Sequence, residues 1–408
     1  MTDMMRRPLP PGWRWVRLGE MCEEHTGTRD PRLEEKQEFV YVDITSVDNV
    51  SKCIFNPKVL PCAEAPSRAR QVIYANDVLV SMTRPNLNAV AMVPQDLDNE
   101  ICSTGFCVLR CRENLNSTYL FAFVQSHEFV QRISDLVKGA LYPAVTDNQI
   151  REQLIPLPPL PEQQRIVAIL SEQMAAIERA RAATESQLEA ARALPAAYLR
   201  AVFNGPEAQQ WPRAWLGEMC EINPARPHLN RADNVITSFL PMAAVEESGR
   251  GIARIAQRPY GEIRKGYTYF AEGDVLFAKI TPCMQNAKHA VARDLIDGVG
   301  FGSTEFHVLR PKNEIISEWV HQFVLQPPVL RAAMAHFTGA VGQQRVPDGF
   351  LATLEIPLPS LPEQRRIVAI LSEQMAAVEK ARQALEAQLD AINRLPATLL
   401  RQAFNGEI

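Results

Sequence analysis

Two segments of the chain repeat apolar or small residues three and four positions apart over about thirty residues, the spacing of an amphipathic α-helix. The positions of these stripes are Ile166, Leu170, Ile177, Ala180, Thr184, Leu188, Ala191 and Leu194, and then Ile367, Leu371, Val378, Ala381, Leu385, Leu389, Ile392 and Leu395. Such a stripe needs a partner, and the second helix must return the chain along the first. The pattern therefore predicts two long antiparallel helices packed like a coiled coil.

The two stripes belong to a repeat. Residues 156–205 return at 357–406 with 35 of 50 positions identical. Each copy begins its helix with a proline followed by a glutamate, which suits a first helical turn, and ends with Asn-Gly, a helix-stop pair. Pro195 and Pro396 occupy the same place in the two copies. Each long helix is therefore expected to end or kink there, before a short final helical segment.

A block of roughly 150 residues precedes each helix, with a pattern typical of strands and turns. The two blocks share the runs DVLVSMTRPNLNAVAMV (77–93) with DVLFAKITPCMQNAKHAV (274–291), and STGFCVLR (103–110) with STEFHVLR (303–310). The sequence predicts an α+β fold, in which two similar α/β domains are separated by two long antiparallel helices related by a pseudo-two-fold axis. The expected boundaries are 1–155, 156–206, 207–356 and 357–408.

Composition changes this picture mainly through charge. The chain has 408 residues, 46% of them hydrophobic, and a net charge of −4. A free-standing nucleic-acid binder usually carries a basic surplus, so basic partner subunits would have to share any phosphate contacts. No apolar stretch approaches the ~18 residues of a membrane span, and no apolar run follows the N-terminal arginines. We therefore expect no membrane association and a cytoplasmic location.

The sequence offers little that points to catalysis. The eight cysteines and seven histidines show no metal-ligand spacing, so buried or idle thiols and no metal site are expected. The nucleotide-binding patterns GxxxxGK(S/T) and GxGxxG are absent, as is an NPPY-like run of the kind that adenine methyltransferases use. Asp274 and Lys279 invite comparison with nucleases, but Asp77 has no lysine at the matching place. We expect no catalytic residues in this chain.

Several motifs together resemble one protein family. WVRLGE, DVLFAKITPCMQNAK, FGSTEFHVLRP, IPLPPLPEQQRIVAIL and the closing LLRQAFNGEI are similar to the DNA-specificity subunits of type I restriction-modification enzymes. The resemblance covers essentially the whole chain in the order recognition domain, helix, recognition domain, helix, and the LPPLPEQ-helix signature occurs twice. It implies a non-catalytic subunit whose two target recognition domains each read one half of a split double-stranded DNA sequence.

The same resemblance implies partners and their cofactors. The paired helices would act as a ruler and as the dock for two adenine methyltransferase (modification) subunits. Those subunits would bring S-adenosylmethionine, and motor-nuclease (restriction) subunits would bring ATP and Mg²⁺, so no cofactor is expected on this chain. Three alternatives are left open: a specificity subunit for a fused restriction-methylation (type IIB-like) enzyme, a coiled-coil protein-binding scaffold, and a cryptic nuclease.

Polar side chains in two loops of each block are candidates for DNA contact. Arg suits guanine edges, Asn and Gln suit adenine edges, and Lys or Thr can hold phosphates. The loop after the DVL run offers Ser81, Thr83, Arg84, Asn86 and Asn88 in the first block, and Lys279, Thr281, Gln285, Asn286 and Lys288 in the second. The segment before each helix offers Tyr142 and Gln149, and then Gln343, Gln344 and Arg345. The alternative is an ordinary polar turn, or a loop that only positions the helix.

Charged residues repeated in the two helices are candidates for partner docking, although a solvated face is the alternative. They are Glu162, Arg165, Glu172 and Glu178, with their copies Glu363, Arg366, Glu373 and Glu379. The glutamines Gln173, Gln187, Gln374 and Gln388 fall on the predicted seam, or face water if the stripe shifts by one residue. A helix from Glu162 to Leu194 would span roughly 50 Å. This length predicts a non-specific gap of about 5 to 8 base pairs between two half-sequences.

Overall fold

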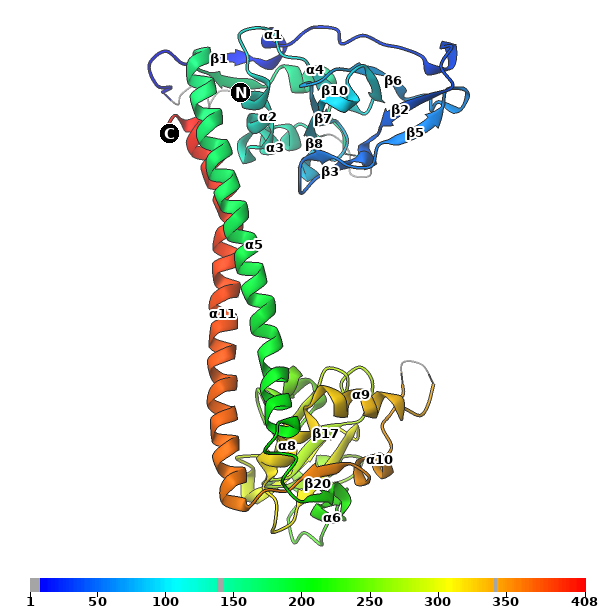
Figure 1. Ribbon diagram of the computed structural model, residues 1–408, viewed down its shortest axis with the longest axis vertical. Helices are drawn as coiled ribbons and strands as arrows, with labels where there is room; N and C mark the ends of the chain where they lie inside the picture. The colour runs from blue at the N-terminus through cyan, green and yellow to red at the C-terminus, as the bar shows by residue number, and fades with distance from the viewer. Residues whose placement is uncertain (1–7, 138–142, 341–342) are drawn as a thin grey trace. The chain divides into compact units, whose positions relative to one another are not determined.

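The computed structural model describes residues 8–137, 143–340 and 343–408. The chain divides into two compact units, one made of Met1–Glu185 with Ala387–Ile408 and the other of Ser186–Glu386. Each unit holds one globular domain, the first part of the long helix that follows this domain, and the last part of the other long helix (Figure 1). The units therefore share both helices, and each is described here by itself.

The globular domain of the first unit contains two main sheets. They have the strand orders β5-β2-β9-β6 and β10-β7-β8, and β2 and β9 form the parallel pair in the first of them. The strands are β1 (Arg14–Arg17), β2 (Glu38–Val42), β3 (Val47–Asp48), β4 (Cys53–Ile54), β5 (Lys58–Pro61), β6 (Ala69–Ile73), β7 (Val78–Ser81), β8 (Val90–Met92), β9 (Glu100–Ser103), β10 (Phe106–Leu109) and β11 (Leu154–Leu157). The α-helices are α1 (Leu18–Met21), α2 (Ser117–Gln125), α3 (His127–Asp135) and α4 (Asp147–Arg151).

The globular domain of the second unit repeats this topology. Its main sheets have the orders β15-β14-β19-β16 and β13-β20-β17-β18, again with one parallel pair, β14 and β19. The strands are β12 (Arg213–Trp215), β13 (Cys220–Ile222), β14 (Ile236–Leu240), β15 (Ala256–Pro259), β16 (Thr268–Ala271), β17 (Val275–Ala278), β18 (His289–Val291), β19 (Val299–Gly302), β20 (Phe306–Pro311) and β21 (Glu355–Pro357). The α-helices are α6 (Leu216–Met219), α7 (Tyr260–Ile263), α8 (Ser317–Val324), α9 (Pro327–Ala335) and α10 (Asp348–Ala352).

The long helices are α5 (Leu160–Asn204) and α11 (Leu361–Asn405). Within the first unit they run antiparallel: Ile166 near the start of α5 shares a core with Phe404 at the end of α11, and Gln388 donates to the hydroxyl of Thr184 at 3.4 Å. In the second unit, Phe203 at the end of α5 shares a core with Ile367 near the start of α11. The predicted fold class, two similar α/β domains with two long antiparallel helices, is confirmed.

The apolar stripes are buried in the cores of the globular domains and also elsewhere along the helices. The first group is Ile166, Leu170, Ile367 and Leu371, and the second is Thr184, Leu188, Ala191, Val378 and Ile392. Ala180, Leu194, Ala381 and Leu395 are exposed although they lie on the predicted stripes. Of the four glutamines on the predicted seam, Gln374 is half-buried and the others, Gln173, Gln187 and Gln388, are exposed. The water-facing alternative therefore describes Gln173 and Gln187 better.

Of the two outcomes expected at the prolines, an end or a kink of the long helix, the end is wrong. Helix α5 continues through Pro195 to Asn204, and α11 continues through Pro396 to Asn405. A proline inside a helix removes one backbone hydrogen bond. The turns that follow Pro195 bury Leu199 and Phe203 against the second domain, and this packing supplies the stability that the missing hydrogen bond would have given.

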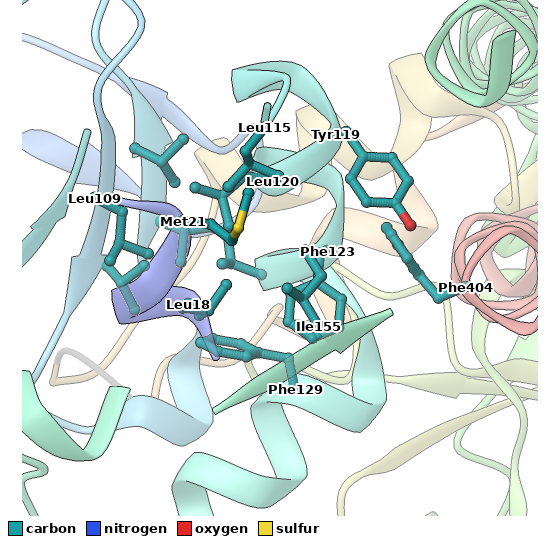
Figure 2. Close-up of a cluster of buried hydrophobic side chains, with 14 of the residues drawn as sticks. Leu18, Met21, Leu109, Leu115, Tyr119, Leu120, Phe123, Phe129, Ile155 and Phe404 are labelled. Atoms are coloured by element: carbon teal, nitrogen blue, oxygen red, sulfur yellow. The ribbon is translucent and has the colours of Figure 1, made fainter. Parts of the chain in front are cut away.

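Aromatic side chains join each domain to the end of a long helix. In the first unit Phe404 of α11 lies 5.2 Å, between ring centroids, from both Tyr119 and Phe123 (Figure 2). In the second unit Phe203 of α5 lies 4.7 Å from Trp319. Full burial of a phenylalanine side chain stabilises a fold by about 1.5–3 kcal/mol. The repeated Phe-Asn-Gly at the end of each helix is thus an anchor for a globular domain.

A buried glutamine fastens the start of each long helix to the domain before it. Gln163 accepts a hydrogen bond from the backbone of Asn116 at 2.8 Å and donates to the carbonyls of Asn114 and Pro158 at 3.1 and 3.0 Å. Gln364 makes the matching contacts in the second unit. These two side chains, both fully buried, give the repeated Pro-Glu-Gln motif a structural role.

Candidate nucleic-acid interface

The candidate loops follow strands whose side chains are all buried. In the first domain β7 lies between β10 and β8, and in the second β17 lies between β20 and β18. A strand that is buried on both faces has no polar side chain to offer solvent. The chain therefore presents polar groups only where the strand ends, at residues 82–88 and at residues 279–288.

The structure brings the two candidate segments of each domain together. In the first domain an antiparallel bridge joins Thr83 to Ala144, and the N–H of Val145 donates to the carbonyl of Met82 at 2.9 Å. In the second domain the bridge joins Ile280 to Arg345, and the N–H of Val346 donates to the carbonyl of Lys279 at 2.9 Å. We call residues 82–88 with 143–149, and residues 279–288 with 343–348, the loop edge of each domain.

Some candidate side chains in the first loop edge, or next to it, hold the loop itself. The buried Ser81 hydroxyl donates to the carbonyl of Thr83 at 3.0 Å and accepts from its N–H at 3.3 Å. The carbonyl of Asn88 accepts a hydrogen bond from the Lys52 ammonium at 2.6 Å. Gln149 closes a capping box with Thr146 at the start of α4.

Other candidates of the first loop edge face solvent. Arg84 and Asn86 are exposed, and Arg84 has the left-handed backbone conformation, with φ of 48°, that starts the short 3-10 helix Pro85–Leu87. The carboxamide oxygen of Asn88 is buried without a hydrogen-bond partner among the described residues. Tyr142 lies outside the described residues. Among the described candidates of this domain, Arg84 and Asn86 are thus the two that are exposed.

The second loop edge is held by hydrogen bonds to a neighbouring turn. Asn286 donates to the carboxylate of Glu247 at 2.9 Å, and Lys288 donates to the carbonyl of Val245 at 3.2 Å. Gln285 is exposed and lies 3.8 Å from the sulfur of Met334. Thr281 pairs with Gln344 through its backbone N–H at 3.0 Å. No observation tests DNA contact by these side chains, and their assignment stays a prediction.

Charged groups gather where the second loop edge meets β20. The Arg345 guanidinium donates two hydrogen bonds to the Glu305 carboxylate, Nε to Oε2 at 2.9 Å and Nη2 to Oε1 at 2.7 Å. This hydrogen bonding lowers the pKa of Glu305 and raises that of Arg345. The neighbouring His307 lies within β20 and is buried, which lowers its pKa, and its Nε2 contacts the carbonyl of Val346 at 2.7 Å.

A surface hollow of about 480 Å³ adjoins this charged group. It is lined by Asn223, Pro224, Arg226, Tyr267, Thr268, Tyr269, Lys279, Phe306 and Val308. Arg226 is exposed and Tyr267 is 44% exposed. Cations, amides and aromatic faces are the groups that proteins use toward nucleic acid. The sequence reasoning missed Arg226, Tyr267 and Glu305, because strand pairing brings them to the loop edge from distant segments.

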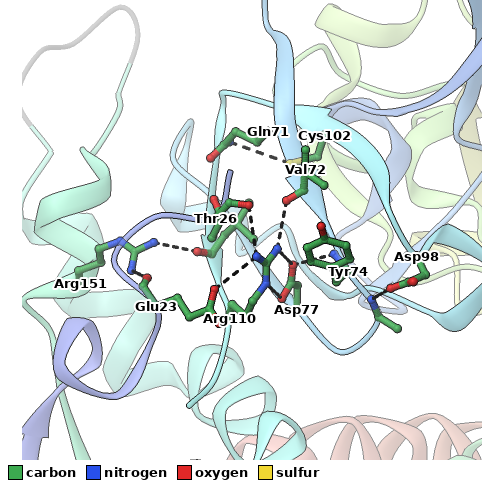
Figure 3. Close-up of polar contacts among 12 residues, drawn as sticks. Glu23, Thr26, Gln71, Val72, Tyr74, Asp77, Asp98, Cys102, Arg110 and Arg151 are labelled. Atoms are coloured by element: carbon green, nitrogen blue, oxygen red, sulfur yellow. Dashed lines mark hydrogen bonds and ion pairs between the residues drawn. The ribbon is translucent and has the colours of Figure 1, made fainter. Parts of the chain in front are cut away.

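Each domain also contains a buried Asp-Arg pair that the sequence did not indicate and that holds the fold together. Asp77, 2% exposed, accepts two hydrogen bonds from Arg110, which also contacts Glu23, Thr26 and Val72 (Figure 3). In the second domain Asp274 and Arg310 repeat the pair at 2.9 and 2.7 Å. The Asp274 carboxylate, which invited comparison with nucleases, is thus buried and held by an arginine.

Most of the candidate docking residues form ion pairs within their own helix. Glu162 pairs with Arg165, and Glu363 with Arg366, at 2.7 and 2.6 Å. Glu379 pairs with Arg382 at 2.7 Å, and this hydrogen bonding lowers the pKa of Glu379 to about 2. Glu178 pairs with Arg181 at 2.6 Å, and Glu172 and Glu373 are exposed. Such exposed pairs contribute less than about 1 kcal/mol each to stability. Stability alone therefore does not explain why these charges are repeated, and they stay candidates for partner binding.

Three further observations concern metal binding, the cysteine thiols and membrane insertion. Among the described residues no three His, Cys, Asp or Glu side chains lie where they could share a metal ion. Burial raises the pKa of the Cys102 and Cys107 thiols, and that of Cys220 to about 12. None of the described helices has the length and apolar character needed to cross a membrane.

Comparisons with known proteins agree with the duplicated architecture. A family model described as the type I restriction modification DNA specificity domain matches residues 10–189 and again residues 210–387. The specificity subunit of the type I restriction enzyme EcoEI from Escherichia coli is 36% identical over 199 residues, which are 48% of this chain and 33% of that protein. The matched region thus spans about a third of that relative's length.

Solved structures match over nearly the whole chain. The HsdS subunit from Thermoanaerobacter tengcongensis is 33% identical with a TM-score of 0.71, and the match covers 99% of each chain. A chain from a study of complex assembly and conformational transition of the type I R-M system is 32% identical with a TM-score of 0.76, covering 98% of this chain and all of that one.

Proposed function

Because the chain belongs to the type I restriction-modification DNA specificity family, we propose that it is the sequence-specific DNA-recognition subunit of a type I restriction-modification complex. Each globular domain reads one half of a split double-stranded target. The observation that carries this proposal is the pair of loop edges: the backbone hydrogen bonds of Val145 and Val346 are the same, while the side chains around them differ. One backbone frame with two sets of polar groups suits the reading of two different half-sequences.

The partners follow from the same proposal. Two adenine methyltransferase subunits dock on the charged faces of α5 and α11 and bring S-adenosylmethionine, and motor-nuclease subunits bring ATP and Mg²⁺. The chain itself is non-catalytic and works in the cytoplasm with the DNA that it reads. Its net charge of −4 supports this arrangement, because phosphate neutralisation dominates DNA affinity and basic partner subunits can supply it.

A domain exchange tests the proposal. Residues 207–355 are replaced by the equivalent block of a relative with a different target, while Gln364 and both long helices are kept. The methylated adenine motif is then mapped in cells that also carry the methyltransferase subunits. We expect one half of the motif to change and the other half to stay the same.

The reciprocal exchange of residues 14–155 serves as the control and should change only the other half. A change of both halves after either exchange would contradict independent reading by the two domains. Absence of any sequence-specific methylation by the unaltered complex would refute the proposed function.

A further inference from the structure

The two loop edges differ at one pair of equivalent backbone positions. The N–H of Met82 donates to the carbonyl of Gly105, and the N–H of Lys279 donates to the carbonyl of Glu305, both at 2.9 Å. Gly105 and Glu305 therefore occupy the same place in the two domains. A Cβ atom at Gly105 would lie 2.8 Å from the Cδ1 atom of Ile44. The first domain thus lacks the carboxylate, and any side chain at residue 105 would have to displace the end of the Ile44 side chain.

The partner of that carboxylate differs in the same way. The bridge between Thr83 and Ala144 in the first domain matches the bridge between Ile280 and Arg345 in the second. The second domain therefore carries a Glu-Arg pair where the first carries Gly and Ala. A pair that only held the fold together would be needed in both copies of the fold, as the pair of Asp77 with Arg110 and its repeat are.

The hydrogen bonds of Arg345 leave one edge of its guanidinium available. An arginine side chain has five N–H donors. Nε and Nη2 each donate to Glu305, and Nη1 donates to the carbonyl of Gln343 at 2.9 Å. Among the described residues, one N–H on each of the two Nη atoms is left without a partner. The side chain of Arg345 is 42% exposed, so this outer edge can reach a ligand.

The outer edge of a fixed guanidinium fits two acceptors that lie side by side. Guanine offers O6 and N7 in this arrangement in the major groove, and a bidentate arginine is the commonest specific contact to it. A phosphate also offers two oxygens, but the Glu305 carboxylate offsets the charge of Arg345, so that the neighbouring Lys279 is the better cation for a phosphate. Because Glu305 also fixes the side chain, little rotamer freedom is lost on binding. The arrangement favours a neutral base edge.

We propose that Arg345, positioned by Glu305, reads a guanine in the half of the target that the second domain recognises. This inference rests on the proposed function and adds to it the base type and the two residues that determine it. Arg345 is the residue that touches the base. Glu305 is a positioning residue, acting through Arg345. The first domain, with Ala144 and Gly105, reads its half-sequence without this device.

The test uses the complete complex and maps methylated adenines across the genome for each variant. We expect Arg345→Ala to relax the motif at one guanine of one half-sequence, with a loss of discrimination of roughly 5- to 150-fold. Arg345→Lys should relax the same position, because a lysine cannot form the bidentate pair. Glu305→Gln should relax it by a smaller factor. The other half-sequence should stay the same throughout, which also shows that each variant folds and assembles.

Arg293→Ala is the matched control. Arg293 pairs with Glu318 and is 49% exposed, but it lines a hollow with Gly273 and Asp274 at the opposite end of β17. This variant should leave the motif unchanged.

Three results would overturn the inference while leaving the proposed function standing. One is a uniform fall of methylation at all sites in Arg345→Ala with base preference unchanged, which would mean a phosphate contact. The second is an unchanged motif in both Arg345 variants. The third is an unchanged motif in Glu305→Gln alone, which would remove the positioning role. Loss of all sequence-specific methylation by the unaltered complex would instead refute the proposed function.

Discussion

At the level of single residues, each domain contains a buried aspartate that pairs with an arginine more than thirty residues further along the chain. Asp77 and Asp274 are 2% and 1% exposed, and each accepts two hydrogen bonds from one arginine. Removing one partner of such a pair leaves an uncompensated charge, which costs more than the intact pair contributes. The repeated Asp-Arg pair therefore belongs to the common scaffold, whereas the Glu305–Arg345 pair belongs to one domain alone.

Buried histidines should make the second unit sensitive to acid. Burial, assisted by the neighbouring His321, lowers the pKa of His289 to about 3, and burial lowers the pKa of His321 itself. Between that value and the ordinary pKa of about 6.5, the unfolded chain binds a proton at His289 that the folded chain does not. The free energy of unfolding should therefore fall as the pH falls from about 6.5, by up to about 1.4 kcal/mol per pH unit for this residue.

Urea unfolding of the wild-type chain and of His289→Gln at pH 7, 6 and 5 measures this effect. The glutamine is neutral throughout, so the variant should lose less stability on acidification than the wild type. The exposed His228 provides the control variant His228→Gln, whose pH dependence should match the wild type. Equal slopes for wild type and His289→Gln would contradict the assignment.

At the level of elements, the attachment of each long helix to its domain depends on one buried glutamine. Gln163→Leu would leave the N–H of Asn116 and the carbonyls of Asn114 and Pro158 without their partner. Each buried backbone group left unsatisfied costs about 1–3 kcal/mol. We therefore expect a loss of several degrees in Tm, measured by thermal unfolding. The adjacent Gln164 is exposed, and Gln164→Leu should leave Tm within about 1–2 °C.

The helices could be predicted from the sequence because their signal is local. The apolar stripes that begin at Ile166 and Ile367 follow the helical period, and the sequence repeat indicates that the two helices have the same structure. Their passage through Pro195 could not be predicted in this way, because the packing of Phe203 against Trp319 decides it. Helix propensity accounts for the hydrogen bond that is lost at the proline, but it does not include packing against a residue that is distant in the sequence.

The sheets and the candidate site show the same limit. The sequence indicated strands, but the parallel pairing of β2 with β9 joins segments about sixty residues apart. The candidate loops were recognisable as polar turns after buried strands. The positions of Glu305 and Arg226 at the candidate site could not be predicted, because they depend on which strands become neighbours. Polarity alone makes Ser81 and Gln149 candidates for DNA contact, and the structure shows that both form hydrogen bonds within the fold.

At the level of the whole molecule, charge sets an expectation for DNA binding by the isolated chain. With a net charge of −4, the chain alone should bind a duplex that contains its target weakly, and the affinity should fall further between 50 and 200 mM salt. Fluorescence anisotropy with and without the methyltransferase subunits measures this, with a duplex of scrambled sequence as the control. Tight, sequence-selective binding by the chain alone at physiological salt would contradict the expectation.

The continuity of both long helices leads to a prediction about target spacing. The division between the two units falls within α5, after Glu185, and within α11, after Glu386. Residues inserted near these points change the length and rotation of the helices without touching either loop edge. Four residues add about 6 Å and a rotation of about 400°, close to one full turn, whereas two residues add about 3 Å and rotate by about 200°.

Four residues inserted after both Ala183 and Ala384, its equivalent in the repeat, should therefore lengthen the non-specific gap by one or two base pairs, at about 3.4 Å each. Both half-sequences should stay the same, because the domains that read them are unaltered. The two-residue insertion at the same sites is the matched control: it turns one end of each helix by about half a turn relative to the other end, and site-specific methylation should be lost. The methylated motif of each variant decides the outcome. An active four-residue variant with an unchanged gap would exclude the helices as the ruler, and altered half-sequences would mean that the helices themselves contact bases.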